Sequence, residues 1–444
     1  MASDDIQHTI VQSVDALFHE QVACLKDLVR FPSLRGSERG IQAYIAEMLS
    51  RQGYTVDRWT IDPVELSQHP GFSPVVDADY AQADNVVGTL PCHSATGRSL
   101  ILNGHVDVVP TGALTGWSSP PFEPVERAGW LYGRGAGDMK AGLTANIFAV
   151  EAIRRAGFSL GATLFQQSVV EEEATGNGAL AAVARGYKAD GALISEPTGE
   201  LIRRGQVGVI WIRVELTAPP AHAGRRSTSG PNVIESCFPL MQALGRLEER
   251  WNAAKPPSFA AVDNPIKIVV SKIGGGEWTS STPASCFFEA RIAIYPERSV
   301  DDCRREIEAT LLEAAQALPL LKAFPPTFRY HGFLSPGYVL PPATAIECEL
   351  AEAHRELCGA TTDIVVHTAL TDARFFVLYQ DTPCMVYGPR VSNIHGLDEG
   401  VDLESLRRVT KVIALFVARW CGIKPRPESS HTGSARDAQG AAVA

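Results

Sequence analysis

Short apolar runs that end abruptly in acidic residues or histidine recur along this chain. Residues 162–170 are mostly apolar or β-branched, and Glu171, Glu172 and Glu173 follow them directly. Such a run, closed by a glycine-containing segment, predicts a buried strand that ends in a loop. Because neighbouring residues of an extended chain point in opposite directions, the three acids cannot share one role. Taken alone, the triplet also fits a solvated loop edge.

Three further apolar runs end in the same way. They are 99–103, followed by His105 and Asp107; 191–195, followed by Glu196; and 383–387, followed by His395. A glycine-dense loop at 131–142 presents Asp138 before an apolar helix predicted from Leu143 to Ala156. Functional groups gather beyond the carboxyl ends of strands in open α/β sheets. We therefore expect these acids and histidines to meet at one edge of a sheet. This expectation argues against the interpretation of the acidic triplet as a solvated loop edge.

The periodicity of the apolar positions divides the chain into two kinds of structure. Strands and helices alternate from 85 to 197, which predicts βαβ units and an α/β domain with a mostly parallel sheet. After Arg204 the order becomes strand 207–216, helix 232–251, strands 266–273 and 286–295, and helix 301–318. That order predicts a small α+β sandwich. Since His395 must return to the sheet edge of His105, the sandwich is expected to interrupt the main domain.

The expected boundaries follow from this division. The main domain comprises residues 1–204 and 326–423, and the inserted α+β domain comprises residues 205–325. Residues 424–444 are polar and small, so we expect a disordered tail.

Composition narrows the class of protein. The formal charge of −10 and the absence of a basic cluster argue against a nucleic-acid partner. The chain shows no signal peptide at its start and no apolar stretch long enough to span a membrane. Its nine cysteines include no CxxC pair, which fits reduced thiols in the cytoplasm and disfavours a cysteine-ligated zinc site. We expect a cytoplasmic protein without nucleic-acid or membrane partners.

The polar residues at the strand ends are suitable metal ligands. Imidazole and carboxylate without thiolate suit Zn²⁺, with Co²⁺ or Mn²⁺ as alternatives. One histidine with one or two acids could hold a single metal, whereas two histidines and three acids match two metals that share a bridging carboxylate. Such a pair lowers the pKa of a water and polarises a carbonyl, but it still needs an unligated base. The acidic triplet offers one. The sequence contains neither HExxH nor GxSxG, which excludes a thermolysin-type site and a serine elbow.

These motifs resemble the M20 family of metallo-aminoacyl hydrolases, and most of all its acetylornithine deacetylase/succinyl-diaminopimelate desuccinylase branch. The matching segments are 104–110 (GHVDVVP), 133–142 (GRGAGDMKAG), 172–173 (EE), 195–198 (SEPT) and 395–399 (HGLDE). They occur in the family's order and span nearly the whole chain. The resemblance implies a catalytic domain, an inserted lid and dimerisation domain, and two divalent metal ions, zinc before cobalt or manganese.

The resemblance also implies a role for each residue of the sheet edge. His105 and Glu196 would bind one metal, His395 and Glu173 the other, and Asp138 would bridge them. Asp107 would orient the imidazole of His105, Glu172 would be the general base, and Glu171 would be structural. A histidine in place of Glu196 would have indicated the carbamoyl-amidohydrolase branch.

In the inserted domain, the resemblance implies that His222 stabilises the oxyanion in the active site of a partner subunit, which requires a homodimer. Arg291 matches a position that grips the substrate carboxylate. Ser280 stands where many members have asparagine, and Arg390 replaces a glycine of the family pattern. Both are candidate substrate-binding residues, although Arg390 could equally form a surface ion pair.

The expected activity is hydrolysis of the amide bond of an N-acylated amino acid or a related small carboxylate. A dipeptidase or carboxypeptidase with the same residues is the first alternative. A catalytically silent binding protein on this fold is the second.

Overall fold

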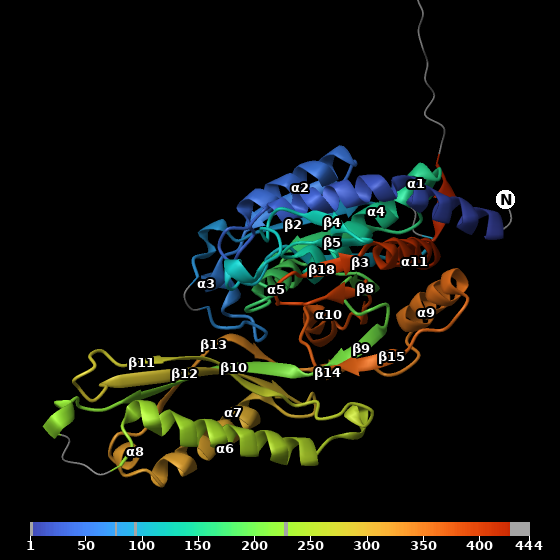
Figure 1. Ribbon diagram of the computed structural model, residues 1–444. Helices are drawn as coiled ribbons and strands as arrows, with labels where there is room; N and C mark the ends of the chain where they lie inside the picture. Colours follow the sequence, from blue (N-terminus) through green and yellow to red (C-terminus); the bar gives the residue numbers. More distant parts are fainter. Residues whose placement is uncertain (1–2, 76–77, 93–95, 226–229, 427–444) are drawn as a thin grey trace, which may run out of the picture.

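Two separate sheets, each with its own hydrophobic core, organise the chain (Figure 1). The computed structural model describes residues 3–75, 78–92, 96–225 and 230–426. The larger domain contains both ends of this described chain. The inserted domain lies below it in the view of Figure 1. This arrangement confirms the predicted α/β class with an inserted α+β unit.

The large sheet is parallel at its centre and antiparallel toward its edges. Its strand order is β1-β2-β7-β3-β8-β16-β9-β14, and β15 pairs with β9. Strands β7, β3, β8 and β16 run parallel to one another. The strands are β1 (Thr55–Thr60), β2 (Asp84–Leu90), β3 (Leu100–His105), β7 (Leu164–Val169), β8 (Gly191–Ile194), β9 (Ile202–Gln206), β14 (Tyr338–Val339), β15 (Ile364–His367) and β16 (Cys384–Val386).

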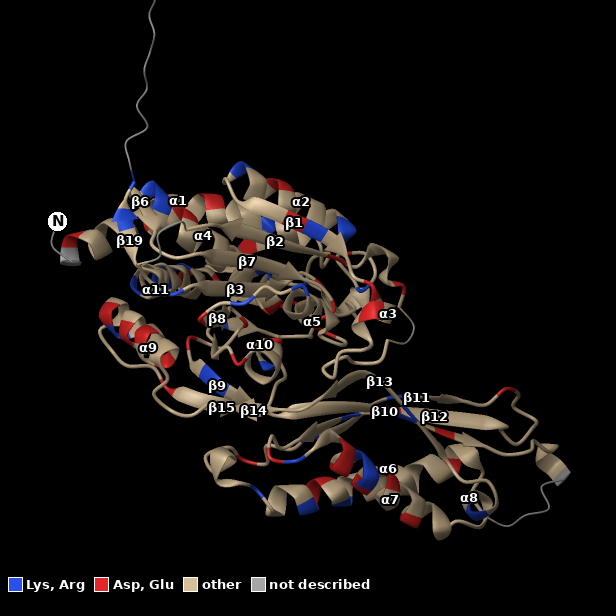
Figure 2. Ribbon diagram, turned by 180° about the vertical axis from the view of Figure 1, so that it is seen from behind, with Lys and Arg blue, Asp and Glu red and all other residues tan. Residues whose placement is uncertain are grey.

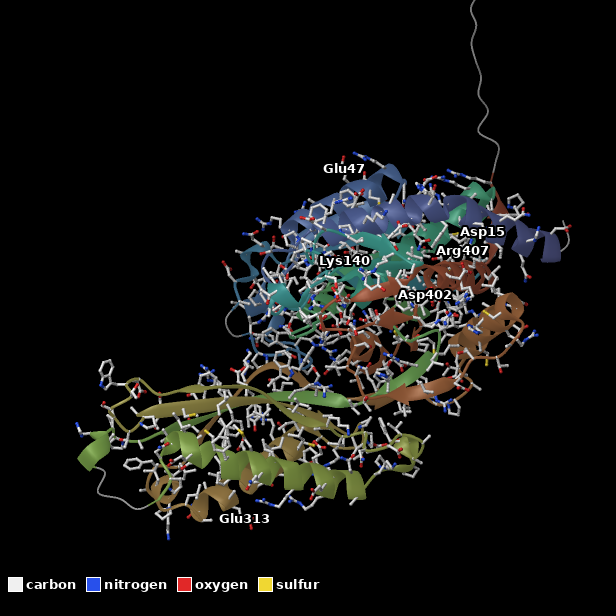
Figure 3. The ribbon with its side chains drawn as sticks, in the orientation of Figure 1. Asp15, Glu47, Lys140, Glu313, Asp402 and Arg407 are labelled. Carbon is white, nitrogen blue, oxygen red and sulfur yellow. The ribbon has the colours of Figure 1, made fainter. Side chains whose placement is uncertain are left out.

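Helices cover this sheet and complete the larger core. They are α1 (Ser3–Arg30), α2 (Arg39–Arg51), α3 (Pro63–Leu66), α4 (Ala141–Arg155), α5 (Asn177–Ala184), α9 (Ala345–Cys358), α10 (Ala373–Gln380) and α11 (Leu403–Cys421). Helix α11 packs against α4, α1 and α9, while α5 packs against α10. Lys140, labelled in Figure 3, is buried at the start of α4, and its ammonium donates to the carbonyl of Phe31 at 3.0 Å.

The inserted domain is a four-stranded antiparallel sheet with helices on one face. The sheet has the order β11-β12-β10-β13. Its elements are β10 (Gly208–Thr217), α6 (Val233–Ala253), β11 (Ile268–Gly275), β12 (Ser285–Ile294), α7 (Val300–Gln316), α8 (Pro319–Ala323) and β13 (Thr327–Ser335). Acidic and basic residues are interspersed on α6 and α7, as expected for helices with one solvated side (Figure 2). The other face of the sheet is turned toward the larger domain (Figure 1).

Strand β13 corrects one predicted boundary. The inserted domain was expected to end at residue 325, but β13 pairs with β10 in its sheet, and the chain rejoins the large sheet only at β14. The prediction was wrong because the prolines of this segment suggested a loop. Pro325 and Pro336 instead flank the strand, where they remove no hydrogen bond from it.

The predicted disordered tail falls mostly outside the described residues. Residues 427–444 belong to that undescribed part, whereas β19 (Ile423–Pro425) pairs with β6 (Phe158–Leu160). Within the described residues, no helix combines the length and the apolar character that crossing a membrane requires.

A small sheet brings two distant segments together beside the carboxyl ends of the central strands. It has the order β17-β18-β5-β4, with β4 (Val125–Arg127), β5 (Trp130–Tyr132), β17 (Val391–Ser392) and β18 (Gly400–Asp402). The hairpin β17–β18 carries His395 in its loop, and β5 leads into the turn that carries Asp138. Pairing of β18 with β5 therefore places His395 near Asp138.

Candidate metal and catalytic site

The structure brings together the predicted residues of the larger domain at the carboxyl ends of β3, β7 and β8. These residues are His105, Asp107, Asp138, Glu172, Glu173, Glu196 and His395. His105 ends β3, the acidic triplet follows β7, and Glu196 follows β8. Because β3 lies between β7 and β8 in a parallel array, their ends meet at one edge. The geometric expectation drawn from the strand ends is thus confirmed.

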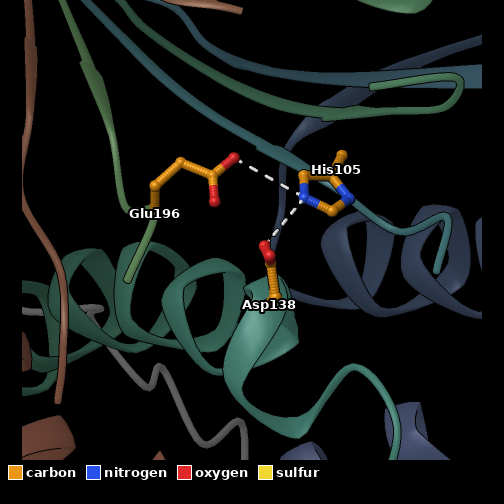
Figure 4. Close-up of side chains that lie close together, drawn as sticks. All are labelled: His105, Asp138 and Glu196. Atoms are coloured by element: carbon orange, nitrogen blue, oxygen red, sulfur yellow. Dashed lines mark hydrogen bonds and ion pairs between the residues drawn. The ribbon is translucent and has the colours of Figure 1, made fainter. Parts of the chain in front are cut away.

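One half of the cluster surrounds His105 (Figure 4). Its Nε2 atom lies 3.3 Å from Oδ1 of Asp138 and 3.5 Å from Oε1 of Glu196. The imidazole is buried, and Glu196 is 6% exposed. These three side chains offer one nitrogen and carboxylate oxygens converging on a single point, which is a donor set suited to a divalent cation such as Zn²⁺.

The other half surrounds His395. Its Nε2 atom lies 3.4 Å from Oδ2 of Asp138 and 3.1 Å from the carboxylate of Glu173. Asp138 therefore directs one oxygen toward each histidine. In each set, His105–Asp138–Glu196 and Asp138–Glu173–His395, the candidate ligand atoms lie within 4.8 Å of one another. The residues present fit two cations that share one carboxylate.

Asp107 fixes the orientation of His105 and of the acidic loop. The Nδ1 atom of His105 lies 2.9 Å from the backbone carbonyl of Asp107, which can only accept, so Nδ1 carries the proton. In the neutral imidazole Nε2 would then present its lone pair toward Asp138 and Glu196, as a metal ligand requires. The Asp107 carboxylate accepts the backbone N–H of Glu172 at 3.3 Å and that of Glu173 at 3.0 Å.

The electrostatics of the cluster favour positive charge. Burial, together with the charge of Glu196, raises the pKa of Glu172 well above its usual value. Burial and repulsion from Asp138 also raise the pKa values of Glu173 and Glu196. Burial opposes protonation of His395, but Asp138 and Glu173 outweigh it and raise its pKa to about 11. Carboxylates that raise one another's pKa are relieved by protons or by bound cations.

Glu171 differs from the other two glutamates in its backbone conformation and in its hydrogen-bond partners. Its φ of +67° turns the chain at the end of β7. Its buried carboxylate receives a bidentate pair from Arg35, with one contact at 2.8 Å, and the hydroxyl of Tyr80 at 2.7 Å. Thr175 adds a third donor at 2.9 Å. Glu171 therefore anchors the loop, in agreement with its predicted structural role.

A buried ion pair that the sequence did not indicate holds the bridging aspartate. One oxygen of Glu399 accepts the backbone N–H groups of Gly137 and Asp138 at 2.9 and 3.0 Å. Its other oxygen lies 2.5 Å from Nη1 of Arg134, and both side chains are only 1% exposed. The guanidinium also donates to the carbonyl of Gly396, next to His395. The pair thus ties the two loops of the small sheet together at the cluster.

The residues predicted in the inserted domain, and Arg390, lie apart from this cluster. His222 is exposed and pairs with Ser281 in an isolated bridge, while the carbonyl of Ser280 accepts from Ala223. The described hydrogen bonds of His222 and Ser280 therefore stay within the inserted domain. Arg390 lies near Glu200, with Nε 3.3 Å from Oε1, which favours the surface ion pair over substrate binding.

Arg291 lies on the face of β12 that is turned toward the larger domain. Its Nη2 atom donates to the carbonyl of Thr368 at 3.3 Å. Among the described residues, no carboxylate approaches its guanidinium within 4 Å.

We expect Glu399→Gln to destabilise the protein and to weaken metal binding. The amide that replaces the carboxylate has no negative charge and can place an N–H group against the guanidinium of Arg134. Breaking a buried ion pair costs roughly 3–5 kcal/mol. The measurements are urea unfolding and metal content after dialysis. Glu404→Gln is the matched control: Glu404 pairs with Arg407 at the surface, where the change should stay within about 0.5 kcal/mol. Equal unfolding free energies for the two variants would contradict the assigned role of Glu399.

Comparison with known proteins agrees with this geometry. Residues 101–419 match the model of peptidase family M20/M25/M40. An N-formyl-4-amino-5-aminomethyl-2-methylpyrimidine deformylase of Bacillus subtilis (strain 168) is 31% identical, over 94% of this chain and 98% of its own. A succinyl-diaminopimelate desuccinylase of Janthinobacterium sp. (strain Marseille) is 26% identical, over 86% of this chain and 94% of its own.

Among solved structures, human carnosine dipeptidase 1 superposes with a TM-score of 0.72 at 17% identity, covering 94% of this chain and 99% of its own. That likeness extends to the fold of both domains. The family match and the 31% identity confirm the resemblance that the motifs indicated. The chain belongs to peptidase family M20/M25/M40 and is a hydrolase of amide bonds.

Proposed function

We propose that this protein is a dinuclear metal-dependent amidohydrolase that removes a small acyl group from an amine. One observation carries the proposal: Asp138 directs its two oxygens at two histidines, each of which has a further glutamate beside it. Its position between two imidazoles and two further carboxylates suits a bridge between two neighbouring cations.

His105, Glu196 and Asp138 would hold one cation, and His395, Glu173 and Asp138 the other. Such cations lower the pKa of a water and polarise an amide carbonyl. The donor set contains imidazole and carboxylate without thiolate, which suits Zn²⁺, Co²⁺ or Mn²⁺.

Glu172 is the general base of this proposal. Its carboxylate approaches His105 Nε2 only to 3.9 Å, and no hydrogen bond to that carboxylate is found in the described part of the chain. It is therefore free to take a proton from the attacking water. As the water oxygen bonds to the acyl carbon and the carbon–nitrogen bond breaks, Glu172 returns this proton to the leaving nitrogen.

A formyl group on an aminomethyl-pyrimidine is the first candidate substrate. The supporting observation is the 31% identity to a deformylase of that compound over nearly the full length of both chains. An N-acylated amino acid is the second candidate. It is favoured by the guanidinium of Arg291, which faces the larger domain without a carboxylate partner among the described residues.

A homodimer in which His222 serves the partner's site is part of the proposal. His222 is exposed on the inserted domain, where it could reach another subunit. The edge strand β11 and the loop after it expose Val269, Ile273 and Trp278, the last to 73%. An exposed apolar strand edge of this kind fits an interface between subunits.

Replacing the second and third glutamates of the triplet should have different effects. We expect Glu172→Gln to abolish formate release while both metals stay bound, because its carboxylate moves a proton and holds no cation. Glu173→Gln should lower the affinity for one of the two metals, because it removes a ligand. Formate assays and metal analysis of the same samples separate the effects. Loss of metal from Glu172→Gln would refute the division of roles.

Mixing two inactive variants tests the role of His222 across the interface. Glu172→Gln and His222→Ala dimers, dissociated and reassociated in equal amounts, should regain roughly a quarter of wild-type activity, because half of the dimers then contain one intact site. A mixture of Glu172→Gln with Glu173→Gln should regain none, since both changes affect the same cluster. If the first mixture also stays inactive, His222 does not act in the partner's site.

A further inference from the structure

A cavity of about 270 Å³ lies on the open face of the inserted sheet, away from its helices. Its walls come from all four strands of the sheet. They include Trp211, Val269, Lys272, Glu289, Arg291 and His331. None of these residues belongs to the metal cluster.

Three polar or aromatic side chains of the cavity form a row across neighbouring strands. Arg291 of β12 is directly opposite Trp211 of β10, so the two side chains stand side by side on one face. The ring of His331, on β13, meets the indole of Trp211 edge to face, with 6.2 Å between centroids. The alternate residues Ile210 and Ile212 are buried on the opposite face. The row therefore belongs to the face that is turned toward the larger domain (Figure 1).

The row lies next to the loop that carries the general base. Gly332 has a φ of +62°, and a β-carbon there would come 2.3 Å from the indole of Trp211 and 3.0 Å from the carbonyl of Ala174. Ala174 directly follows Glu173. The indole and the acidic loop thus pack around the same glycine. The sheet face that holds the cavity therefore borders the acidic loop.

The groups of the row that lack partners are mostly donors. Within the described chain, Nε1 of Trp211 and Nε2 of His331 are buried without a hydrogen-bond partner. Nε2 of His331 does lie 3.8 Å from Oε1 of Glu289, which is too far for a hydrogen bond. Arg291 has no carboxylate within 4 Å there and donates only a long bond to Thr368. Glu289, in contrast, is engaged by Arg213 at 2.9 Å and by Lys272 at 3.1 Å. Buried donors of this kind are normally satisfied, so the row is suited to a ligand that brings acceptors.

The shape and chemistry of the row favour a flat ring over a carboxylate. A carboxylate could accept from the guanidinium and from an N–H group, but it would leave the flat faces of the indole and the imidazole uncovered. A planar ring can pack against both aromatic side chains, and its ring nitrogens can accept from the indole N–H and from Arg291. Burial lowers the pKa of His331, which keeps its imidazole neutral and suited to such packing.

We propose that Trp211, Arg291 and His331 form the subsite for the amine side of the substrate, and that this side is a planar nitrogen heterocycle such as an aminopyrimidine. The subsite deepens the proposed deacylase function and rests on it. The row would position the ring while the scissile amide reaches Glu172.

The test measures binding of the free amine, 4-amino-5-aminomethyl-2-methylpyrimidine, to the metal-loaded protein by calorimetry, in parallel with the KM for its formylated form. We expect Trp211→Leu to weaken amine binding and to raise KM roughly tenfold or more, since both ring packing and a hydrogen bond are lost. Trp211→Phe should lose less, because it keeps a ring. Metal content should stay unchanged in both variants.

Arg291→Met should weaken amine binding in the same assay, whereas Arg329→Met should not. Arg329 is a matched control on the same sheet, exposed and paired with Glu215. The subsite is refuted if the wild type does not bind the amine, or if Trp211→Leu binds it as the wild type does. It is also refuted if Arg291→Met raises only the KM for N-formyl amino acids, which would indicate a carboxylate subsite.

Failure of the proposed function gives a different result. Amine binding is measured without turnover, so binding that depends on Trp211 without formate release would overturn the deformylase assignment and leave the heterocycle subsite standing. Formate release with a KM that Trp211→Leu does not change would overturn the heterocycle subsite and leave the deformylase assignment standing.

Discussion

Electrostatic repulsion among buried carboxylates is the constraint on which the structure of this site depends. Parallel pairing of β7, β3 and β8 forces Glu172, Glu173 and Glu196 to one edge of the sheet, and the small sheet adds Asp138. Burial raises the pKa values of Glu172, Glu173 and Glu196, and the charges of neighbouring acids add to this effect. Such an arrangement is unfavourable by itself, and two cations would convert it into a stable set of ligands. The fold thus creates a local charge imbalance that the proposed chemistry uses.

The surrounding residues distinguish ligands from supports. Glu171 and Glu399 carry the same carboxylate group as their neighbours, but each is paired with an arginine and holds backbone or hydroxyl groups in place. Glu172 has no such partner among the described residues, which in the proposed mechanism leaves it available for proton transfer. Similar side chains therefore differ in role through the groups that donate to them. In the proposed mechanism this distinction assigns separate tasks to the three glutamates.

Much of the site could be predicted from the sequence, because strand ends are local features. The apolar runs before His105, Glu172 and Glu196 indicated where the strands end, and parallel pairing of the strands brings these ends to one edge of the sheet. The partners of Glu399 could not be predicted in this way, because Arg134 is distant in sequence and reaches it only through the pairing of β18 with β5. The strand β13 was missed because its flanking prolines suggested a loop.

The open face of the inserted sheet was the least predictable part of the molecule. Trp211, Arg291 and His331 come from three strands, and nothing local in the sequence indicates that they share a face. Only the register of β10 against β12 and β13 places them in a row. The proposed reaction class follows from the geometry of the strand ends, whereas the proposed substrate subsite depends on these long-range pairings.

The proposed chemistry requires two cations that share Asp138. Anomalous diffraction at the zinc absorption edge, from crystals of the zinc-loaded protein, would locate them. We expect two peaks flanking Asp138, one in contact with His105 and Glu196 and the other with Glu173 and His395. A single peak, or two peaks of which one lies away from Asp138, would contradict it.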